Sequence, residues 1–107
     1  MIPTTLPAET LDRTVRFFRD AEAKFGALRA LGVCSFGPVD RRRDSPTYGF
    51  ITSTPKDGWR NTDLLGVLRS SFPISAGFDT DVNGAALGEA RWGAARGFDH
   101  VLYITVG

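Results

Sequence analysis

ISAGFDTDVNGAALGEARWGAARG, residues 74–97, is the stretch of sequence that decides the fold. Its first part, Ile74 to Phe78, is short and mostly apolar, which predicts a strand. From Asp81 onward, small and apolar residues recur near helical spacing until Gly97, which predicts a helix over this part. A strand that runs directly into a helix is typical of a sheet covered by helices.

The same kind of pattern continues on both sides of this unit. The expected elements are a helix that begins near Pro7 and stops at Gly26, strands over residues 28–36 and 48–51, a helix over 62–71 capped by Thr62 or Asn61, and a final strand from His100 to Val106. This order predicts an α/β fold in which helices flank a mixed sheet. A strand at the extreme end of the pattern suggests that the sheet is incomplete in this chain.

Length and charge limit the classes of protein to consider. The chain has 107 residues, enough for one domain or a piece of one. Thirteen Lys and Arg against twelve Asp and Glu leave a net charge of +1, so no overall field attracts nucleic acid or a membrane surface. Without a leader-like segment or an apolar run of about 20 residues, a cytoplasmic protein is expected.

Several single residues have a plain structural interpretation. Cys34 is the one cysteine and lies in an apolar run, so we expect a buried, inert thiol. The charged run over residues 40–44 predicts a solvated loop, with a phosphate-binding patch as the alternative. Trp59 and Trp92 are expected to pack rather than to stack on a ligand, Glu89 is expected on an exposed face, and His100 receives no role.

The segment FDTDVNGAALGE, residues 78–89, places two carboxylates and an amide where the strand meets the helix. Ligand sites in α/β sheets gather at such strand ends. Asp81 could cap the helix by accepting a hydrogen bond from the N–H of Asn83 or Gly84. It could also accept a proton from a substrate hydroxyl, because a helix N-terminus favours the ionised carboxylate. The two interpretations are compatible.

Three blocks of sequence resemble, in order and spacing, the N-terminal lobe of bacterial fructokinases of the ROK family (repressor, open reading frame, kinase). The blocks are GVCSFGPVD at residues 32–40, YGFITSTPK at 48–56 followed by Gly58 and Trp59, and residues 78–89. Residues 2–5 and 103–107 also look like family segments, so the resemblance covers nearly all of the chain.

The resemblance implies a function and a set of site residues. The fold would be an incomplete N-terminal lobe of the ribonuclease H-like ATPase fold of actin and hexokinase. The reaction would be phosphoryl transfer from ATP, with Mg²⁺, to a hexose hydroxyl, and Asp81 matches the family's catalytic base. Gly37, Pro38 and Thr54 would line the sugar pocket, with Thr80 beside the reacting hydroxyl. Thr80 replaces an asparagine of many relatives, which favours fructose and hence fructose 6-phosphate as product.

The resemblance also implies what this chain would leave out. Residues 1–107 would be a single partial domain without the first β-hairpin, its glycine-rich phosphate loop, the larger C-terminal lobe and the zinc motif. Gly107 would stand on the cofactor side, before a second phosphate contact. We therefore expect a chain that is inactive alone and prone to self-association, from a family that is often homodimeric. A segment of a sugar-sensing repressor and a non-catalytic sugar-binding or interaction module remain as alternatives.

Overall fold

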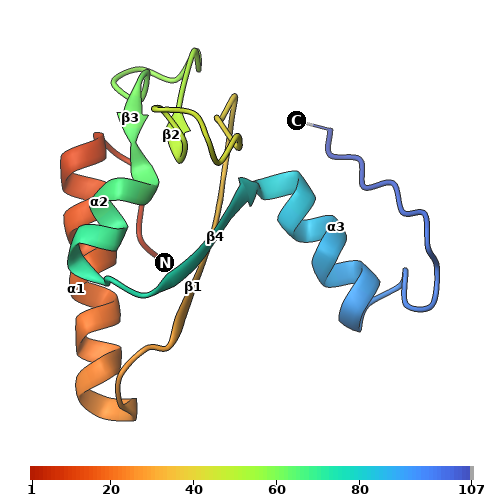
Figure 1. The fold of residues 1–107 in the computed structure, drawn as a ribbon, viewed down its shortest axis with the longest axis horizontal. Coiled ribbons are helices and arrows are strands. Elements are labelled where there is room, and N and C mark those ends of the chain that lie inside the picture. The colour runs from red at the N-terminus through yellow and green to blue at the C-terminus, as the bar shows by residue number, and fades with distance from the viewer. Residues whose placement is uncertain (107) are drawn as a thin grey trace.

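A short parallel sheet lies at the centre of the chain in the computed structural model, which describes residues 1–106 (Figure 1). The elements are α1 (Pro7–Phe25), β1 (Ala30–Ser35), β2 (Phe50–Ile51), β3 (Thr62–Asp63), α2 (Leu64–Ser71), β4 (Ser75–Thr80) and α3 (Asp81–Trp92). β1 and β4 pair in parallel from Ala30 opposite Ser75 to Ser35 opposite Thr80. β2 and β3 form a separate antiparallel pair.

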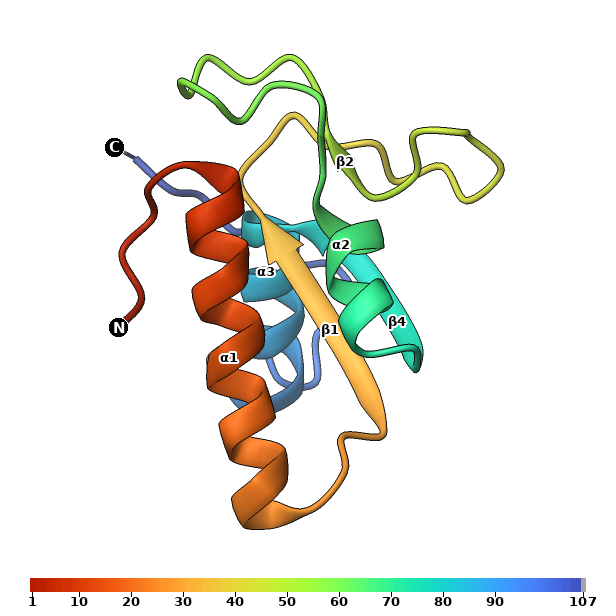
Figure 2. The same cartoon turned by 90° about the vertical axis from the view of Figure 1, so that its left-hand side faces the viewer.

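Helices cover both faces of the β1–β4 sheet, as the predicted α/β arrangement requires. Figures 1 and 2 show α1 and α2 on one face and α3 on the other. Parallel strands need a crossover connection, and here α2 lies in the connection that returns the chain to β4. Among residues 1–106, no helix is both long enough and apolar enough to cross a bilayer.

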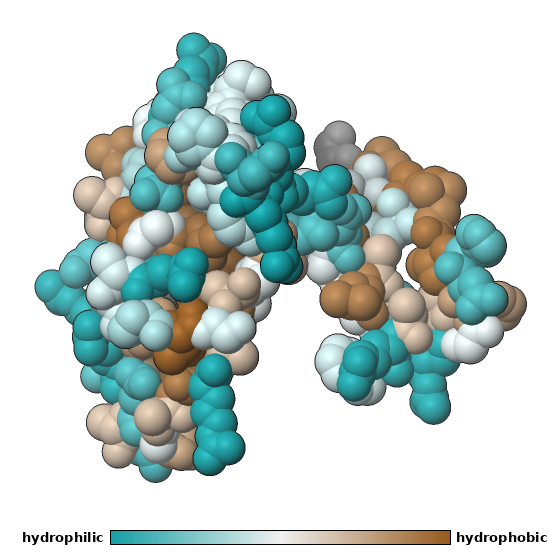
Figure 3. All heavy atoms as spheres, viewed as in Figure 1, coloured by the Kyte–Doolittle hydropathy of each residue, from teal (hydrophilic) through white to brown (hydrophobic). Residues whose placement is uncertain are grey.

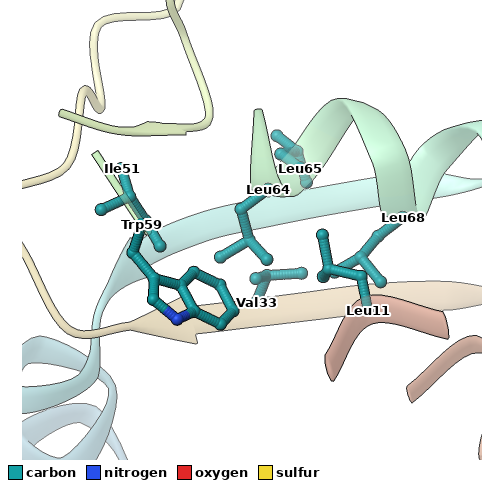
Figure 4. Close-up of a cluster of buried hydrophobic side chains, with 7 residues drawn as sticks. All are labelled: Leu11, Val33, Ile51, Trp59, Leu64, Leu65 and Leu68. Carbon is teal, nitrogen blue, oxygen red and sulfur yellow. The ribbon is translucent and has the colours of Figure 1, made fainter. Parts of the chain in front are cut away.

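The hydrophobic core lies between the sheet and the first two helices (Figure 4). It consists of Leu11, Val33, Ile51, Trp59, Leu64, Leu65 and Leu68. Three of its four leucines come from α2, where their positions at i, i+1 and i+4 place them on one side of the helix. Burial of a leucine side chain contributes about 1.5–3 kcal/mol, so this side of α2 holds it against the sheet.

The start of α2 differs from the prediction. Asp63, rather than Thr62 or Asn61, caps the helix, because its side chain accepts a hydrogen bond of 2.9 Å from the N–H of Gly66. Thr62 pairs with β2 instead, and its hydroxyl donates to the carbonyl of Trp59 at 2.7 Å. Asn61 has a φ of 56°, a left-handed conformation that suits a turn before the strand.

The C-terminal part of the chain also departs from the prediction. Helix α3 ends at Trp92 rather than near Gly97, and the strand expected from His100 to Val106 is wrong. This segment turns back past α3 without pairing with β1 or β4 (Figure 1). A β-rich sequence forms a strand only where a neighbour accepts its backbone hydrogen bonds, so composition alone misled the prediction.

Two side chains predicted to be buried are exposed. Val33 and Ser35 are buried, and Cys34 between them therefore projects from the opposite face of β1. The thiol is exposed there, although Gly84 of α3 lies against it: a Cβ added to Gly84 would be 2.5 Å from its Sγ atom. Trp92 is 76% exposed, against the packing role expected for it, whereas the packing role of Trp59 is confirmed by its 3% exposure.

Candidate active site

The ends of β1 and β4 create the edge of the sheet at which the candidate site residues lie. Because the strands are parallel and Ser35 is paired with Thr80, both strands deliver their following residues to the same edge. The segment that contains Gly37 and Pro38 leaves β1 there, and Asp81 follows β4. This is the edge at which α/β sheets bind ligands.

Thr80, not Asp81, is the N-cap of α3. The Thr80 Oγ1 atom accepts a hydrogen bond of 3.2 Å from the N–H of Asn83. The predicted capping role of Asp81 is therefore wrong by one position. Asp81 is the first residue of the helix, it is exposed, and its Oδ1 atom accepts from the N–H of Val82 at 2.9 Å. Its carboxylate stays at the positive end of the helix dipole.

Asp81 lines a hollow of about 370 Å³, a volume within the range of small-ligand pockets. Its other lining residues are Thr4, Thr10, Leu11, Thr14, Val33, Cys34, Ser35, Phe36, Trp59, Leu64 and Leu68. The hollow thus lies between the start of α1 and the ends of the two strands. None of the four predicted sugar-binding residues lines it.

The segment after β1 is held against β2. The carbonyl oxygen of Pro38 accepts hydrogen bonds from the Thr52 backbone N–H at 2.8 Å and from the Thr52 hydroxyl at 3.1 Å. Val39 forms a bridge with Ile51. These contacts hold the backbone at Pro38 and Val39 against β2. Gly37 and Pro38 therefore lie in an ordered turn.

Thr54 is buried within its own loop. Its side chain is 2% exposed, and its Oγ1 atom accepts a hydrogen bond of 3.3 Å from the N–H of Lys56. The loop encloses a separate hollow of about 240 Å³ lined by Thr54, Pro55, Lys56, Asp57, Gly58 and Arg60. Asp81 and Thr54 therefore line different hollows in this structure.

Asp79 connects three segments at the edge of the sheet. Its Oδ1 atom accepts hydrogen bonds from the backbone N–H of Thr80 at 2.7 Å, from Nδ2 of Asn83 at 2.8 Å and from Nη1 of Arg41 at 2.9 Å. Partial burial raises the pKa of Asp79, but the hydrogen bonds from Asn83, Thr80 and Arg41 together outweigh it and leave the pKa below its ordinary value.

The contact with Arg41 was not predicted. Sequence proximity groups Asp79 with Asp81 and Asn83, whereas Arg41 stands 38 positions away in a run of charges. No local pattern joins residues so far apart.

The charged loop has a buried carboxylate at its base. Residues 41–44 are exposed, as predicted, but Asp40 is 6% exposed. Its oxygens accept from the side chain of Arg42 at 3.1 and 3.2 Å and from the hydroxyls of Ser45 and Thr47, both at 2.6 Å. These hydrogen bonds, that of Arg42 first, hold the pKa of Asp40 far below its ordinary range.

Within residues 1–106, no three His, Cys, Asp or Glu side chains lie close enough together to hold a metal ion. Gly107, the residue expected on the cofactor side, lies outside the described residues.

Comparisons with known proteins agree with the resemblance found in the sequence. The chain is 48% identical over 105 residues to a putative fructokinase of Bacillus subtilis (strain 168), covering 98% of the chain and 33% of that protein. It is 45% identical over 107 residues to the fructokinase of Zymomonas mobilis subsp. mobilis, covering 99% and 36%. The chain therefore spans about a third of the length of these relatives.

A solved structure supports the fold. The crystal structure of an inorganic polyphosphate/ATP-glucomannokinase from Arthrobacter sp. strain KM matches 86% of this chain and 36% of its own, with a TM-score of 0.66 at 23% sequence identity. The fold is accordingly a part of the actin and hexokinase type of domain. The family model of ROK matches residues 1–107, and the chain belongs to the ROK family.

Proposed function

We propose that this chain is the sugar-binding part of a fructokinase-like kinase, which transfers a phosphoryl group from ATP to a hexose hydroxyl and converts fructose to fructose 6-phosphate. The observation that carries the proposal is the position of Asp81, an exposed carboxylate on the first residue of α3 at the joint edge of two parallel strands. The 45–48% identity to proteins named as fructokinases supports the choice of sugar.

Asp81 would act as the general base. It would orient the attacking sugar hydroxyl by a hydrogen bond and take its proton as the phosphoryl group is transferred. Phosphoryl transfer passes through a loose transition state, so catalysis depends mainly on positioning and on the balance of charge. A helix N-terminus suits this role, because its dipole attracts a negatively charged group.

The sugar would be held by groups around this carboxylate. Gly37 and Pro38 would supply backbone contacts from the turn after β1, and Thr80 would stand beside the reacting hydroxyl. The Thr80 oxygen already accepts from Asn83, but its hydroxyl proton can still be donated. Thr54 would join the pocket only if its loop opened, because its side chain is buried.

ATP and Mg²⁺ belong to the proposal as phosphoryl donor and as the cation that balances charge on its phosphates. Residues 1–106 hold no group of three His, Cys, Asp or Glu side chains that could bind this cation. The nucleotide would be bound by parts of the polypeptide beyond these residues. A cytoplasmic location and a homodimeric full-length protein complete the proposal.

A chimera tests the function directly. Residues 1–107 would replace the matching segment of the Zymomonas mobilis fructokinase, to which they align over 107 residues. We expect fructose-dependent ADP formation from the chimera. We expect Asp81→Asn to lower kcat about a thousandfold, the scale of a lost general base, while calorimetric binding of fructose changes by less than about tenfold.

The control is Asp44→Asn, which removes a carboxylate from an exposed position in the charged loop and should leave kcat unchanged. Turnover by Asp81→Asn at close to the rate of the unsubstituted chimera would rule out Asp81 as the base. Fructose binding without any phosphorylation by a folded chimera would instead favour a non-catalytic sugar-binding module.

A further inference from the structure

We propose that Asp79 is a positioning residue, which holds the turn after β1 and the start of α3 in one fixed arrangement. The proposal rests on the proposed function, since these two segments carry the candidate sugar contacts and the candidate base. Asp79 itself would touch neither the sugar nor the phosphate. It would act through Arg41 on one side and through Asn83 on the other.

The hydrogen bonds at Asp79 come from three different elements and converge on one oxygen atom. Arg41 lies in the loop, the Thr80 N–H is at the end of β4, and Asn83 is in the first turn of α3. A carboxylate accepts several such bonds at once, and bonds to an ionised acceptor are stronger than bonds to a neutral one. The depressed pKa of Asp79 follows from the same contacts and keeps it ionised.

The loop of Arg41 has its other polar contacts on a different side. The backbone N–H of Asp40 donates to the carbonyl of Phe50 at 3.0 Å, and the Asp40 carbonyl accepts from Gly49 at 2.9 Å. These bonds tie the loop to the segment around β2, whereas the bond between Arg41 and Asp79 ties it to β4 and α3. An edge-to-face contact between Tyr48 and Phe78, with ring centroids 6.1 Å apart, accompanies this link.

The link matters because it joins the two parts of the proposed site. Arg41 stands three residues after Pro38, and Asp79 stands two residues before Asp81. Helix α3 has no buried residue, so packing alone holds its start weakly. A misplacement of about 1 Å can cost about a hundredfold in rate. The hydrogen bonds at Asp79 therefore determine where the proposed base stands relative to the sugar.

Hydrogen exchange on the 107-residue chain tests the structural half of this proposal without any activity. In Asp79→Ala we expect the backbone amides of Thr80 and Asn83 to exchange at least fivefold faster. Amides of β1 and of α2 should be unchanged. Arg41→Gln removes the exposed contact with Asp79, so we expect this variant to fold. It should speed amide exchange in the loop that carries residue 41. Unchanged exchange in both variants would overturn the proposal.

Kinetics of the chimera test the functional half. We expect Arg41→Gln to raise the KM for fructose about fivefold with little change in kcat, and Asp79→Ala to raise KM and to lower kcat, each about tenfold. Because both residues act through one link, the double variant should have the KM of Asp79→Ala alone. Asp79→Glu, which keeps the charge, should recover part of the loss.

The outcomes separate this inference from the function on which it rests. The positioning role would be refuted if the effects of Arg41→Gln and Asp79→Ala on KM multiplied in the double variant. It would also be refuted if the Asp79→Ala chimera had normal KM and kcat. Asp44→Asn, which removes a charge from the same loop, should match the unsubstituted chimera in both constants. Normal turnover by Asp81→Asn would refute the general base instead, and the exchange measurements would still decide the role of Asp79.

Discussion

Two regions of the chain differ in how far their apolar side chains are buried. We call residues 1–80 the body and residues 81–106 the limb. The body contains every buried hydrophobic residue of the described chain, and the limb contains none. The limb instead exposes Leu87, Trp92, Phe98, Val101, Leu102, Tyr103, Ile104 and Val106. Figure 3 shows brown areas over the part that carries α3 and the C-terminal segment. Asp81 stands at the boundary.

The comparison explains why two helices of different composition are held with different strength. α2 places three leucines in the core, whereas α3 has no buried residue and places Gly84 against Cys34 of β1. Small residues let the helix approach the strand closely but remove little apolar area from water, at about 25 cal/mol per Å². The candidate base is therefore carried by the less firmly held region. Self-association of the chain stays a prediction. The exposed apolar side chains of the limb are the surface on which we expect it.

The largest effect should come from the core of the body. Leu65 is 2% exposed, and Leu65→Ala should lower the free energy of unfolding by about 2–5 kcal/mol because it leaves a cavity. Leu87 in α3 is 68% exposed, and Leu87→Ala should change it by less than about 0.5 kcal/mol. Urea denaturation followed by circular dichroism measures both. Equal losses would mean that the limb is packed as firmly as the body.

A pair of glycines in α3 tests how closely the limb meets the body. A Cβ at position 84 would lie 2.5 Å from Sγ of Cys34, whereas one at position 88 would meet nothing within 4 Å. Gly88→Ala should therefore stabilise by about 0.5–1 kcal/mol through helix propensity. Gly84→Ala should lose that gain and destabilise by about 1–3 kcal/mol. The same denaturation assay applies, and stabilisation by both would show that α3 does not rest on β1.

The smallest expected effect is the dependence of the body's stability on pH through Asp40. Its pKa is lowered by folding, so it contributes stability above its unfolded pKa of about 3.9. That contribution is lost as the pH falls from about 5 toward the lower folded value. Asp40→Asn should therefore show a smaller drop in Tm between pH 7 and pH 3 than the unsubstituted chain.

Ser45→Ala supplies the graded control for this measurement. It removes one of the donors to Asp40 and should give a pH dependence between the other two. A Tm that falls equally in all three proteins would mean that Asp40 does not link the loop's stability to pH.

Elements with a strong local pattern were predicted well. Pro7 at the start and Gly26 at the end bound α1 as expected, and the apolar runs form β1 and β4 within a few residues of their predicted limits. The start of α3 at Asp81 was predicted as well, although β4 continues to Thr80 rather than ending at Phe78. These features depend on residues that are adjacent along the chain.

Features that depend on distant partners were not predicted. The final strand was wrong because no neighbour pairs with residues 100–106, and Cys34 was assigned to the core because an apolar run does not reveal which face α3 leaves open. The cap of α3 shifted from Asp81 to Thr80 by a single residue, which local spacing does not resolve. In the candidate site, the base Asp81 was predicted from a sequence motif, whereas the contact between Asp79 and Arg41 beside it was not.

The sequence by itself determined the family, the order of helices and strands, and the candidate base, because each depends on residue types at fixed local spacings. Only the tertiary structure decided that Asp79 joins Arg41 to Asn83, that Asp40 is buried beneath its loop, and that Thr54 lines a different hollow from Asp81. The physical reason is that hydrogen bonds and burial depend on distances in space. Residues 38 positions apart come within 2.9 Å only after the parallel strands pair.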